Sequence, residues 1–379
     1  MSKKIHVVAF QNPFPADYGG VIDVYFRLRE LRRRGVFVVL HTFVYADRKT
    51  RAEDLAEVAD EVYFYPRHTG LRSWFSRLPY IVNSRRSNNL IDRLLADNAP
   101  VLFEGLHCCA QIGEPRLASR TKILRAHNVE HDYYSGLAKS ERNPFKKFYF
   151  KTEARRLKRF EPRAVAHADT VLAISSSDAD HFKKLYPEKT VLEIPCFFDA
   201  DARNSQTSEQ KRFVLYHANL SVAENISAAL RIINDITTRL SEIPFVIAGK
   251  NPDPAILKAA ASAPNVRIVS NPDDKQMESL VSSAAVTLLL TSQATGIKIK
   301  LLTTLVSGRH IIANEPMLRG TSLHSYCTVA DTDADIIEAV KRLIDKPFEG
   351  RMLPSDYSPS DLAAKIIGIA FPNSRTSDS

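Results

Sequence analysis

Short apolar runs recur along the whole chain and alternate with segments that have the spacing of an amphipathic helix. Most runs are apolar without interruption and rich in β-branched and aromatic residues, which is typical of parallel strands covered on both faces. This alternation of strand and helix predicts an α/β chain with doubly wound sheets. We expect strands at residues 4–10, 37–44, 61–65, 100–106, 121–126, 169–174 and 189–194, and again at 212–218, 244–248, 265–269, 285–290, 309–313 and 325–329.

The alternation is interrupted by residues 199–211, which are polar and have no periodicity. A chain of 379 residues also suits two cores better than one. We therefore predict two Rossmann-like domains, residues 1–198 and 212–357, joined by this linker. Residues 358–379 are expected to form a C-terminal helix, at 359–370, and a disordered tail. Because ligands bind at the carboxyl ends of parallel strands, we expect the two domains to face a shared ligand cleft.

The N-terminus lacks the apolar core and the cleavage site of a signal peptide, and no apolar stretch approaches the roughly 20 residues of a spanning helix. We therefore expect a cytoplasmic protein that is at most peripheral on the inner face of a membrane. The four cysteines have no spacing typical of a zinc site or a disulfide framework. We expect them to be buried as small hydrophobic residues in a reducing compartment.

Lys and Arg total 52 and Asp and Glu total 43, so the chain carries a formal charge of +9. This excess suits an anionic partner: a phosphorylated ligand, an acidic lipid surface or nucleic acid. Nucleic acid is ranked last, because no compact recognition module is present. Residues 142–163 hold nine Lys or Arg residues interleaved with aromatic residues. Such a segment can contact an anionic membrane peripherally, or it can be a solvated helix whose aromatic residues pack into the core.

Several residues at predicted strand ends are candidates for chemistry in the first half. Gly19 and Gly20 open a helix after the first strand, where backbone N–H groups can approach an anion; a turn that only requires glycine is the alternative. His107 and His127 follow the fourth and fifth strands, and Glu130 follows shortly after. We expect His127 to emerge at the cleft, where it can move a proton, with His107 the next candidate. Glu130 can instead cap the following helix.

The second half offers a set of candidates for anion binding. His217 and Asn219 end its first strand, and Lys250 ends the next one. Lys298 and Lys300 open a helix, where their charge opposes the helix dipole. A bound diphosphate would neutralise these two lysines, and a solvated pair is the alternative. No metal site is expected at these strand ends.

Taken together, these segments resemble the GT-B glycosyltransferases, specifically the retaining family 4 and its bacterial mannosyltransferase-like members. The resemblance covers nearly the whole chain and rests on the following segments: YGG, FEGLH, RAHNVEHDYY, YHANLSVAEN, IAGKNP, ATGIKIKLL and SGRHIIAN. It implies that the second domain binds a nucleotide-diphosphate sugar as co-substrate, without a metal or other cofactor, and that the first domain binds the acceptor. Gly19 and Gly20 match the family's glycine loop, and His127 matches its cleft histidine. The residues that match the donor loop are Gly296, Ile297, Lys298 and Lys300.

The chain also departs from this family in its donor loop. Many relatives have a glutamate where this chain has Thr303, and an Arg and a Lys in the loop that here reads HANLSVAEN. The departure shifts the expected phosphate contacts onto Lys298, Lys300 and Lys250, and leaves the nucleotide open.

The resemblance implies a retaining hexosyltransferase, with mannose as a candidate sugar. Its acceptor is expected to be a glycan or a lipid-linked group in the synthesis of cell-surface polysaccharide or glycoconjugate. The alternatives are a nucleotide-sugar epimerase of the same fold and an interaction protein that has lost donor binding.

Overall fold

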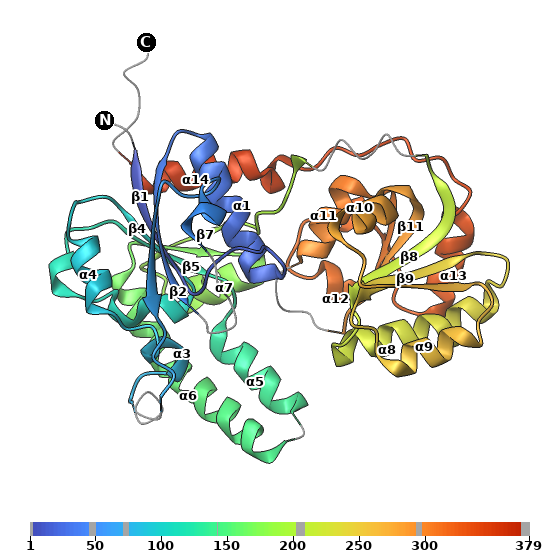
Figure 1. Ribbon diagram of the computed structural model, residues 1–379, viewed down its shortest axis with the longest axis horizontal. Helices are drawn as coiled ribbons and strands as arrows, with labels where there is room; N and C mark the ends of the chain where they lie inside the picture. Colours follow the sequence, from blue (N-terminus) through green and yellow to red (C-terminus); the bar gives the residue numbers. More distant parts are fainter. Residues whose placement is uncertain are drawn as a thin grey trace, which may run out of the picture. The chain divides into compact units, whose positions relative to one another are not determined.

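The computed structural model describes residues 3–44, 51–70, 76–141, 143–201, 209–292 and 298–372. The chain divides into two compact units, each with its own sheet (Figure 1). The first unit comprises Met1–Phe198 together with Ser355–Ser379, and the second comprises Asp199–Pro354.

The described residues of the first unit form a seven-stranded parallel sheet with the order β3-β2-β1-β4-β5-β6-β7. Its strands are β1 (Lys4–Ala9), β2 (Phe37–Val44), β3 (Glu61–Pro66), β4 (Val101–Glu104), β5 (Lys122–Ala126), β6 (Thr170–Ala173) and β7 (Thr190–Glu193). Its α-helices are α1 (Gly19–Arg33), α3 (Tyr80–Asn83), α4 (Asn88–Leu94), α5 (Glu130–Ser140), α6 (Pro144–His167), α7 (Ser176–Leu185) and α14 (Pro359–Ala370). Short 3₁₀ helices occupy Ala52–Leu55, Leu106–Gln111, Pro115–Leu117 and Ser355–Tyr357.

Helices cover both faces of this sheet, which explains why most residues of its strands are apolar. Successive strand residues point to opposite faces. Val8 and Phe103 therefore belong to the core cluster that contains residues of α4 and α6, whereas their neighbours Val7 and Leu102 belong to the cluster that contains residues of α1 and α14.

The C-terminal helix α14 returns to the first unit, although the long first segment of that unit ends at Phe198. It lies beside α1 (Figure 1), and its Leu362 and Ile366 share a core cluster with Val24 and Leu28 of α1. Arg34, which follows α1, donates a hydrogen bond of 2.7 Å to the hydroxyl of Ser360. The second unit accordingly ends at Pro354, whereas the sequence places the end of the second domain at residue 357.

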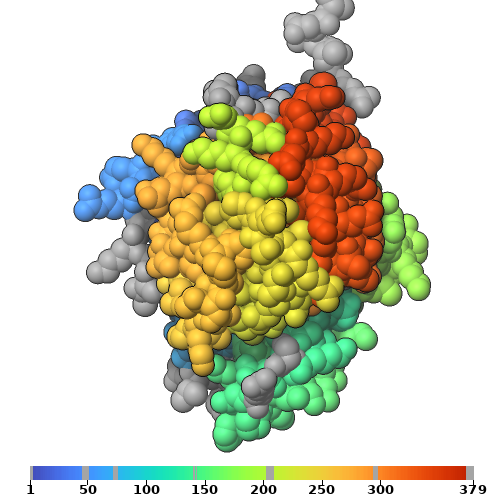
Figure 2. Space-filling model, turned by 90° about the vertical axis from the view of Figure 1, so that its right-hand side faces the viewer, coloured from blue at the N-terminus to red at the C-terminus, as the bar shows by residue number. Residues whose placement is uncertain are grey.

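The described residues of the second unit form a six-stranded parallel sheet with the order β10-β9-β8-β11-β12-β13. Its strands are β8 (Lys211–Asn219), β9 (Phe245–Lys250), β10 (Val266–Ser270), β11 (Ala284–Leu289), β12 (His310–Ala313) and β13 (Thr328–Val329). Its α-helices are α8 (Ala223–Arg231), α9 (Pro254–Ala261), α10 (Asp274–Ser283), α11 (Ile299–Ser307), α12 (Glu315–Leu318) and α13 (Asp333–Leu343). A π-helical turn at Ile232–Ile236 and 3₁₀ turns at Thr237–Arg239 and His324–Tyr326 complete the unit, whose yellow, orange and red segments pack closely in Figure 2.

Every strand predicted from the sequence is present, and the prediction of two doubly wound α/β units is confirmed. Cys108, Cys109 and Cys196 are buried as expected, and Cys327 is half-buried. Within the part of the chain that the structure describes, no helix is both long enough and apolar enough to cross a membrane.

Candidate functional site

The carboxyl ends of three neighbouring strands, β1, β4 and β5, bring the candidate histidines of the first unit together. Phe10 follows β1, His107 lies in the 3₁₀ helix after β4, and His127 directly follows β5. The ring centre of Phe10 is 5.5 Å from that of His107 and 5.6 Å from that of His127. Both histidines therefore contact the same aromatic ring.

His127 belongs to a buried network of charged side chains. Its Nε2 atom lies 2.8 Å from Oε2 of Glu104, and the other carboxylate oxygen of Glu104 accepts a hydrogen bond from Arg27. Asp23 accepts hydrogen bonds from Arg27 at 2.8 Å and from Arg125 at 3.2 Å. Two carboxylates thus face two guanidinium groups, and the network is neutral when the imidazole is neutral.

This network holds Asp23 in the charged form. Burial alone would raise the pKa of Asp23, but the guanidinium groups of Arg125 and Arg27 outweigh burial and hold it below its usual range. Asp23, Glu104 and His127 each offer a ligand atom within 4.8 Å of the others. The two guanidinium groups already neutralise these carboxylates, so the arrangement does not favour a metal ion.

The burial of His127 differs from the sequence-based expectation that its side chain emerges at an open site. Only 5% of the residue is exposed, because its hydrogen bond to Glu104 directs the ring inward. A carboxylate can only accept, so Nε2 carries the hydrogen and Nδ1 offers a lone pair. Among the described residues Nδ1 has no hydrogen-bond partner, and Oδ2 of Asp23 lies 3.8 Å away. Nδ1 is therefore the atom of His127 that offers a lone pair, and it is buried.

His107 faces Glu130, the third residue predicted for catalysis. The Nδ1 atom of His107 lies 3.8 Å from Oε1 of Glu130, which is in the first turn of α5. Burial, reinforced by the carboxylate of Glu161, raises the pKa of Glu130 to about 8, so this side chain is a neutral acid at pH 7. Burial and the nearby Arg85 hold the pKa of His107 well below its usual value. A protonated carboxyl group thus faces a neutral imidazole.

Gly19 and Gly20 begin α1 and are half-exposed. A Cβ atom on Gly20 would lie 3.2 Å from the Phe10 ring and 3.3 Å from the Tyr18 ring. The close approach of these two rings is therefore a structural reason for glycine at position 20. The first turn of α1 contains no acidic side chain. The positive end of the helix dipole is therefore not compensated by a carboxylate within that turn.

In the second unit, the two lysines of the predicted donor loop lie at the start of α11 and are half-buried. Lys300 lies 6.0 Å from the centre of the Tyr216 ring, and its Nζ is 3.5 Å from the carbonyl oxygen of Leu290. Burial, followed by repulsion from Lys300, lowers the pKa of Lys298 to about 8, and burial also lowers the pKa of Lys300. These two cations are therefore held where their charge is poorly stabilised, which favours an anion beside them.

His217, which lies near the end of β8, faces this helix. Its Nε2 lies 3.3 Å from the hydroxyl of Thr304 in α11. Burial and the charge of Lys300 lower the pKa of His217 to about 4, so the ring is neutral at pH 7. The structure thus brings His217 to the helix that the lysines open, with Lys300 close enough to affect its pKa.

Asn219 ends β8 and Lys250 ends β9. The two residues lie opposite each other in the sheet, and both are exposed. The Asn219 side chain accepts hydrogen bonds from the backbone and the hydroxyl of Ser221, which shapes the turn into α8. Gly296 and Ile297 lie outside the described residues. Thr303, where the resemblance predicts a glutamate, donates a hydrogen bond from its hydroxyl to the carbonyl oxygen of Ile299 in its own helix, at 3.0 Å.

Sequence reasoning missed Glu224, in the first turn of α8. Its carboxylate accepts hydrogen bonds from the hydroxyl of Thr291 and, at 2.7 Å, from the backbone N–H of Ser292. Its negative charge also raises the pKa of Lys298 and Lys300, which partly offsets the lowering caused by burial. An acidic residue at the start of the helix after β8 is the signal that could have identified it.

Sequence reasoning also missed the charged partners of His127. Asp23 and Arg27 stand four residues apart on the buried face of α1, and Arg125 and Glu104 lie inside apolar strands. Charges in such positions are the sequence signal of a buried ion network.

Comparison with protein families gives a match for the second unit. Residues 211–346 match the family described as Glycosyl transferases group 1. Over 335 residues the chain is 25% identical to an uncharacterized 44.6 kDa protein in the cps region of Klebsiella pneumoniae, and the match covers 84% of each chain.

Solved structures share the fold over nearly the whole chain. Sucrose-phosphate synthase from Thermosynechococcus elongatus superposes with a TM-score of 0.59 at 11% identity, covering 98% of this chain and 94% of that one. An α-glucosyltransferase in complex with UDP and a 13-mer DNA has a TM-score of 0.54 at 13% identity, covering 98% and 95%. These similarities confirm the GT-B fold that the sequence motifs predict.

Proposed function

We propose that this chain, a glycosyltransferase with a group 1 domain at residues 211–346 and the GT-B fold, transfers a hexose from a nucleotide-diphosphate sugar to a glycan or lipid-linked acceptor. The observation that carries the proposal is the pair of half-buried lysines at the start of α11. Mannose is the first sugar to test, and we propose retention of anomeric configuration without a metal.

Cleavage of the donor leaves negative charge on the departing nucleoside diphosphate. Lys298 and Lys300 offer cations at a helix N-terminus, where backbone N–H groups also favour an anion. A bound diphosphate would raise the lowered pKa of each lysine, so binding and full protonation support each other. Neutral His217 can then donate or accept a hydrogen bond without adding charge. The UDP bound to the α-glucosyltransferase of similar fold supports this class of ligand.

Proton transfer at the acceptor is assigned to the first unit. Nδ1 of His127 is a base whose opposite nitrogen is oriented by Glu104, and Glu130 is an acid that is still protonated at pH 7. The transfer releases one proton from the acceptor hydroxyl, which His127 would take, whereas His107 and Glu130, 3.8 Å apart, can hold the acceptor by hydrogen bonds. The relative in a cps region supports an acceptor of cell-surface polysaccharide synthesis.

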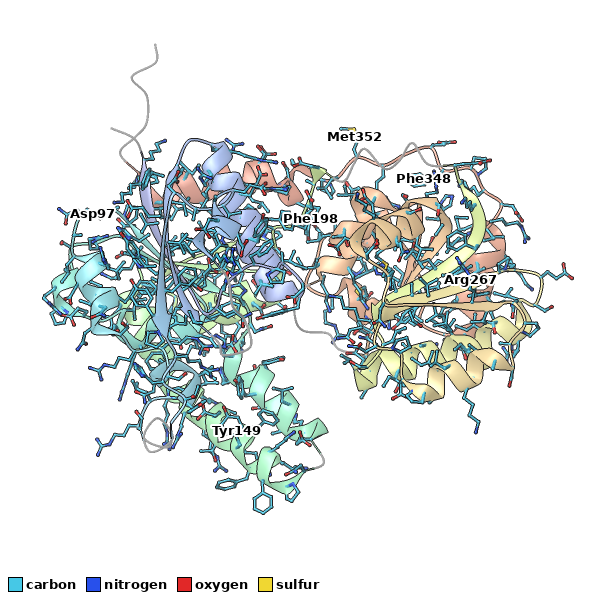
Figure 3. The ribbon with its side chains drawn as sticks, in the orientation of Figure 1. Asp97, Tyr149, Phe198, Arg267, Phe348 and Met352 are labelled. Atoms are coloured by element: carbon cyan, nitrogen blue, oxygen red, sulfur yellow. The ribbon has the colours of Figure 1, made fainter. Side chains whose placement is uncertain are left out.

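We also propose that the hairpin of α5 and α6 contacts the inner face of a membrane. The two helices extend side by side away from the sheet of the first unit (Figure 1). Phe145 and Phe148 are 84% and 68% exposed near the start of α6, whereas Tyr149 (labelled in Figure 3) and Phe150 are half-buried. The sequence left two alternatives for these aromatic residues, contact with a membrane or packing into the core. Phe145 and Phe148 are free to contact a membrane, whereas Tyr149 and Phe150 pack partly into the protein.

Basic side chains gather behind this exposed tip. A groove of about 550 Å³ between α5 and α6 is lined by five of them: Lys139, Lys147, Lys151, Arg155 and Lys158. Apolar rings at the tip and cations along the groove are the combination that binds an interface of anionic lipid.

The experiment that tests the function is a transfer assay with labelled nucleotide sugars, GDP-mannose first, with and without an oligosaccharide or polyprenyl-linked acceptor. We expect sugar transfer that requires the acceptor and persists in EDTA. Isomerised sugar without an acceptor would instead indicate an epimerase. If no nucleoside diphosphate raises the melting temperature, the chain is an interaction protein, because a ligand specific for the native state must stabilise it.

A further inference from the structure

Two histidines and a glutamate from three helices of the first unit converge on one point. His131 comes from the first turn of α5, Glu161 from α6 and His181 from α7. Nδ1 of His131 lies 3.2 Å from Oε2 of Glu161, and Nε2 of His181 lies 3.7 Å from Oε1 of the same carboxylate. One ligand atom from each of the three side chains lies within 4.8 Å of the other two.

These separations are close to those of a tetrahedral metal site. Bonds of about 2.0–2.1 Å from Zn²⁺ to imidazole nitrogen and carboxylate oxygen place two ligands of a tetrahedron about 3.3 Å apart. The nitrogen–oxygen distances of 3.2 and 3.7 Å, which run to the two different oxygens of Glu161, are close to this value. The two imidazole rings are already tilted against each other, at 48°, with centres 5.6 Å apart.

His131 also lines the groove that carries Lys158 and four other basic side chains, so the case for a cation rests on the buried carboxylate itself. Glu161 is 2% exposed and His131 is 8% exposed, so the carboxylate is largely withdrawn from water. Within the described part of the chain, Nε2 of His181 is buried and has no hydrogen-bond partner. On the far side of the His131 ring, Nε2 lies 3.6 Å from Oδ1 of the exposed Asp132, which is beyond hydrogen-bonding distance.

The contrast with the network around His127 is informative. There, Arg27 and Arg125 already neutralise the carboxylates of Glu104 and Asp23. Around Glu161 the groups within hydrogen-bonding reach are the His131 ring and the uncharged hydroxyl of Tyr186, which donates at 3.2 Å. A divalent cation would therefore meet a carboxylate that carries no guanidinium partner among the contacts described.

We propose that His131, Glu161 and His181 bind one divalent cation of the zinc type, with a fourth position left for water. Two imidazoles and one carboxylate suit Zn²⁺, whereas Mg²⁺ and Ca²⁺ prefer oxygen ligands only. The ion links the start of α5 and the middle of α7 to α6, next to Glu130. Its role is structural, because the donor lysines belong to the other unit and the proposed transfer needs no metal.

The test is a titration of the chelator-treated chain with Zn²⁺, read by calorimetry and by metal analysis after gel filtration. We expect one bound zinc per chain, a higher melting temperature with Zn²⁺ and no such rise with Mg²⁺. His181→Ala and Glu161→Gln should each weaken zinc binding by at least about 10-fold. His181 is at the edge of the cluster, with 24% of its side chain exposed, so its variant is expected to fold.

The matched control is His324→Ala, which removes an exposed histidine that pairs with Glu315 at 3.2 Å. It should leave zinc binding unchanged. The proposal is overturned if the wild-type chain retains no zinc, if folded His181→Ala binds zinc as well as the wild type, or if His324→Ala causes the loss. None of these measurements uses a sugar donor or an acceptor, so they do not depend on the proposed function.

Discussion

Glu104 holds His127 by a hydrogen bond of 2.8 Å between its Oε2 atom and Nε2 of the imidazole, while its other oxygen accepts from Arg27. Both oxygens of this buried carboxylate are thus engaged, which fixes the ring orientation and the tautomer of His127. The relationship resembles a base held by an orienting carboxylate, and it makes the role of His127 testable apart from its role in folding.

We predict that His127→Ala loses at least about 100-fold in sugar transfer, the low end of what a positioned acid–base group contributes. Binding of the nucleoside diphosphate should persist, since its proposed contacts are in the second unit. Transfer rate and nucleotide affinity are measured on the same folded preparation. An unfolded variant would show that His127 is a core residue, and normal transfer would move the assignment to His107.

Asp23→Asn should destabilise the first unit by about 3–5 kcal/mol, because it leaves Arg27 and Arg125 buried without their shared anion. The measurement is urea unfolding followed by a probe of the first unit. The control is Glu114→Gln, which breaks an exposed pair with Arg116 in the same unit and should change stability far less. Equal losses for the two variants would contradict a buried network.

How far the sequence predicts this structure depends on which interactions are local. Continuous apolar runs identify every strand, because strands covered on both faces need no alternation. The packing of α14 on α1 is not predictable in this way, since an apolar helix face does not specify which unit it covers. The partners of His127 were missed for a related reason. In the sequence, Arg125 only interrupts an apolar strand, and its partner Asp23 is about 100 residues away along the chain although the two side chains are in contact.

Glu130 predicts a pH dependence of stability. Its folded pKa of about 8 lies above the unfolded value of about 4.5, so the folded chain holds this proton between these two pH values while the unfolded chain loses it. Stability therefore falls as pH rises from about 5 to 8, by up to about 1.4 kcal/mol per pH unit from this group.

We expect Glu130→Gln to remove that part of the decline, so that its melting temperature exceeds that of the wild type increasingly toward pH 8. The scans are made with a chelator present, because Glu161 contributes to the raised pKa of Glu130. Glu188→Gln, at an exposed position after α7, is the control and should follow the wild type. Parallel curves for Glu130→Gln and the wild type would show that Glu130 is already ionised in the folded chain.

For the hairpin, we predict sedimentation with liposomes that contain anionic lipid, and loss of this binding as salt is raised. Replacing Phe145 and Phe148 together by Ser should weaken the binding, because it removes the exposed apolar rings of the tip. Met352→Ser, at a site that is 87% exposed, is the matched control for losing an exposed apolar side chain. Equal recovery with neutral liposomes, or none with either kind, would argue against a membrane contact.

The last prediction concerns Lys298 and Lys300, on which the donor assignment depends. Each charge-assisted hydrogen bond to phosphate is expected to contribute roughly 1.5–3 kcal/mol, so replacing both lysines by Ala should weaken nucleoside diphosphate binding by at least about tenfold. The substitutions also remove two cations that burial disfavours, so the unliganded variant should be as stable as the wild type or more so. Weaker binding together with undiminished stability is the pattern of residues kept for a ligand rather than for folding. Calorimetric titration and thermal unfolding measure the two quantities, with Lys341→Ala on the exposed face of α13 as the control. A folded double variant with unchanged affinity would refute the assignment of these lysines to the donor.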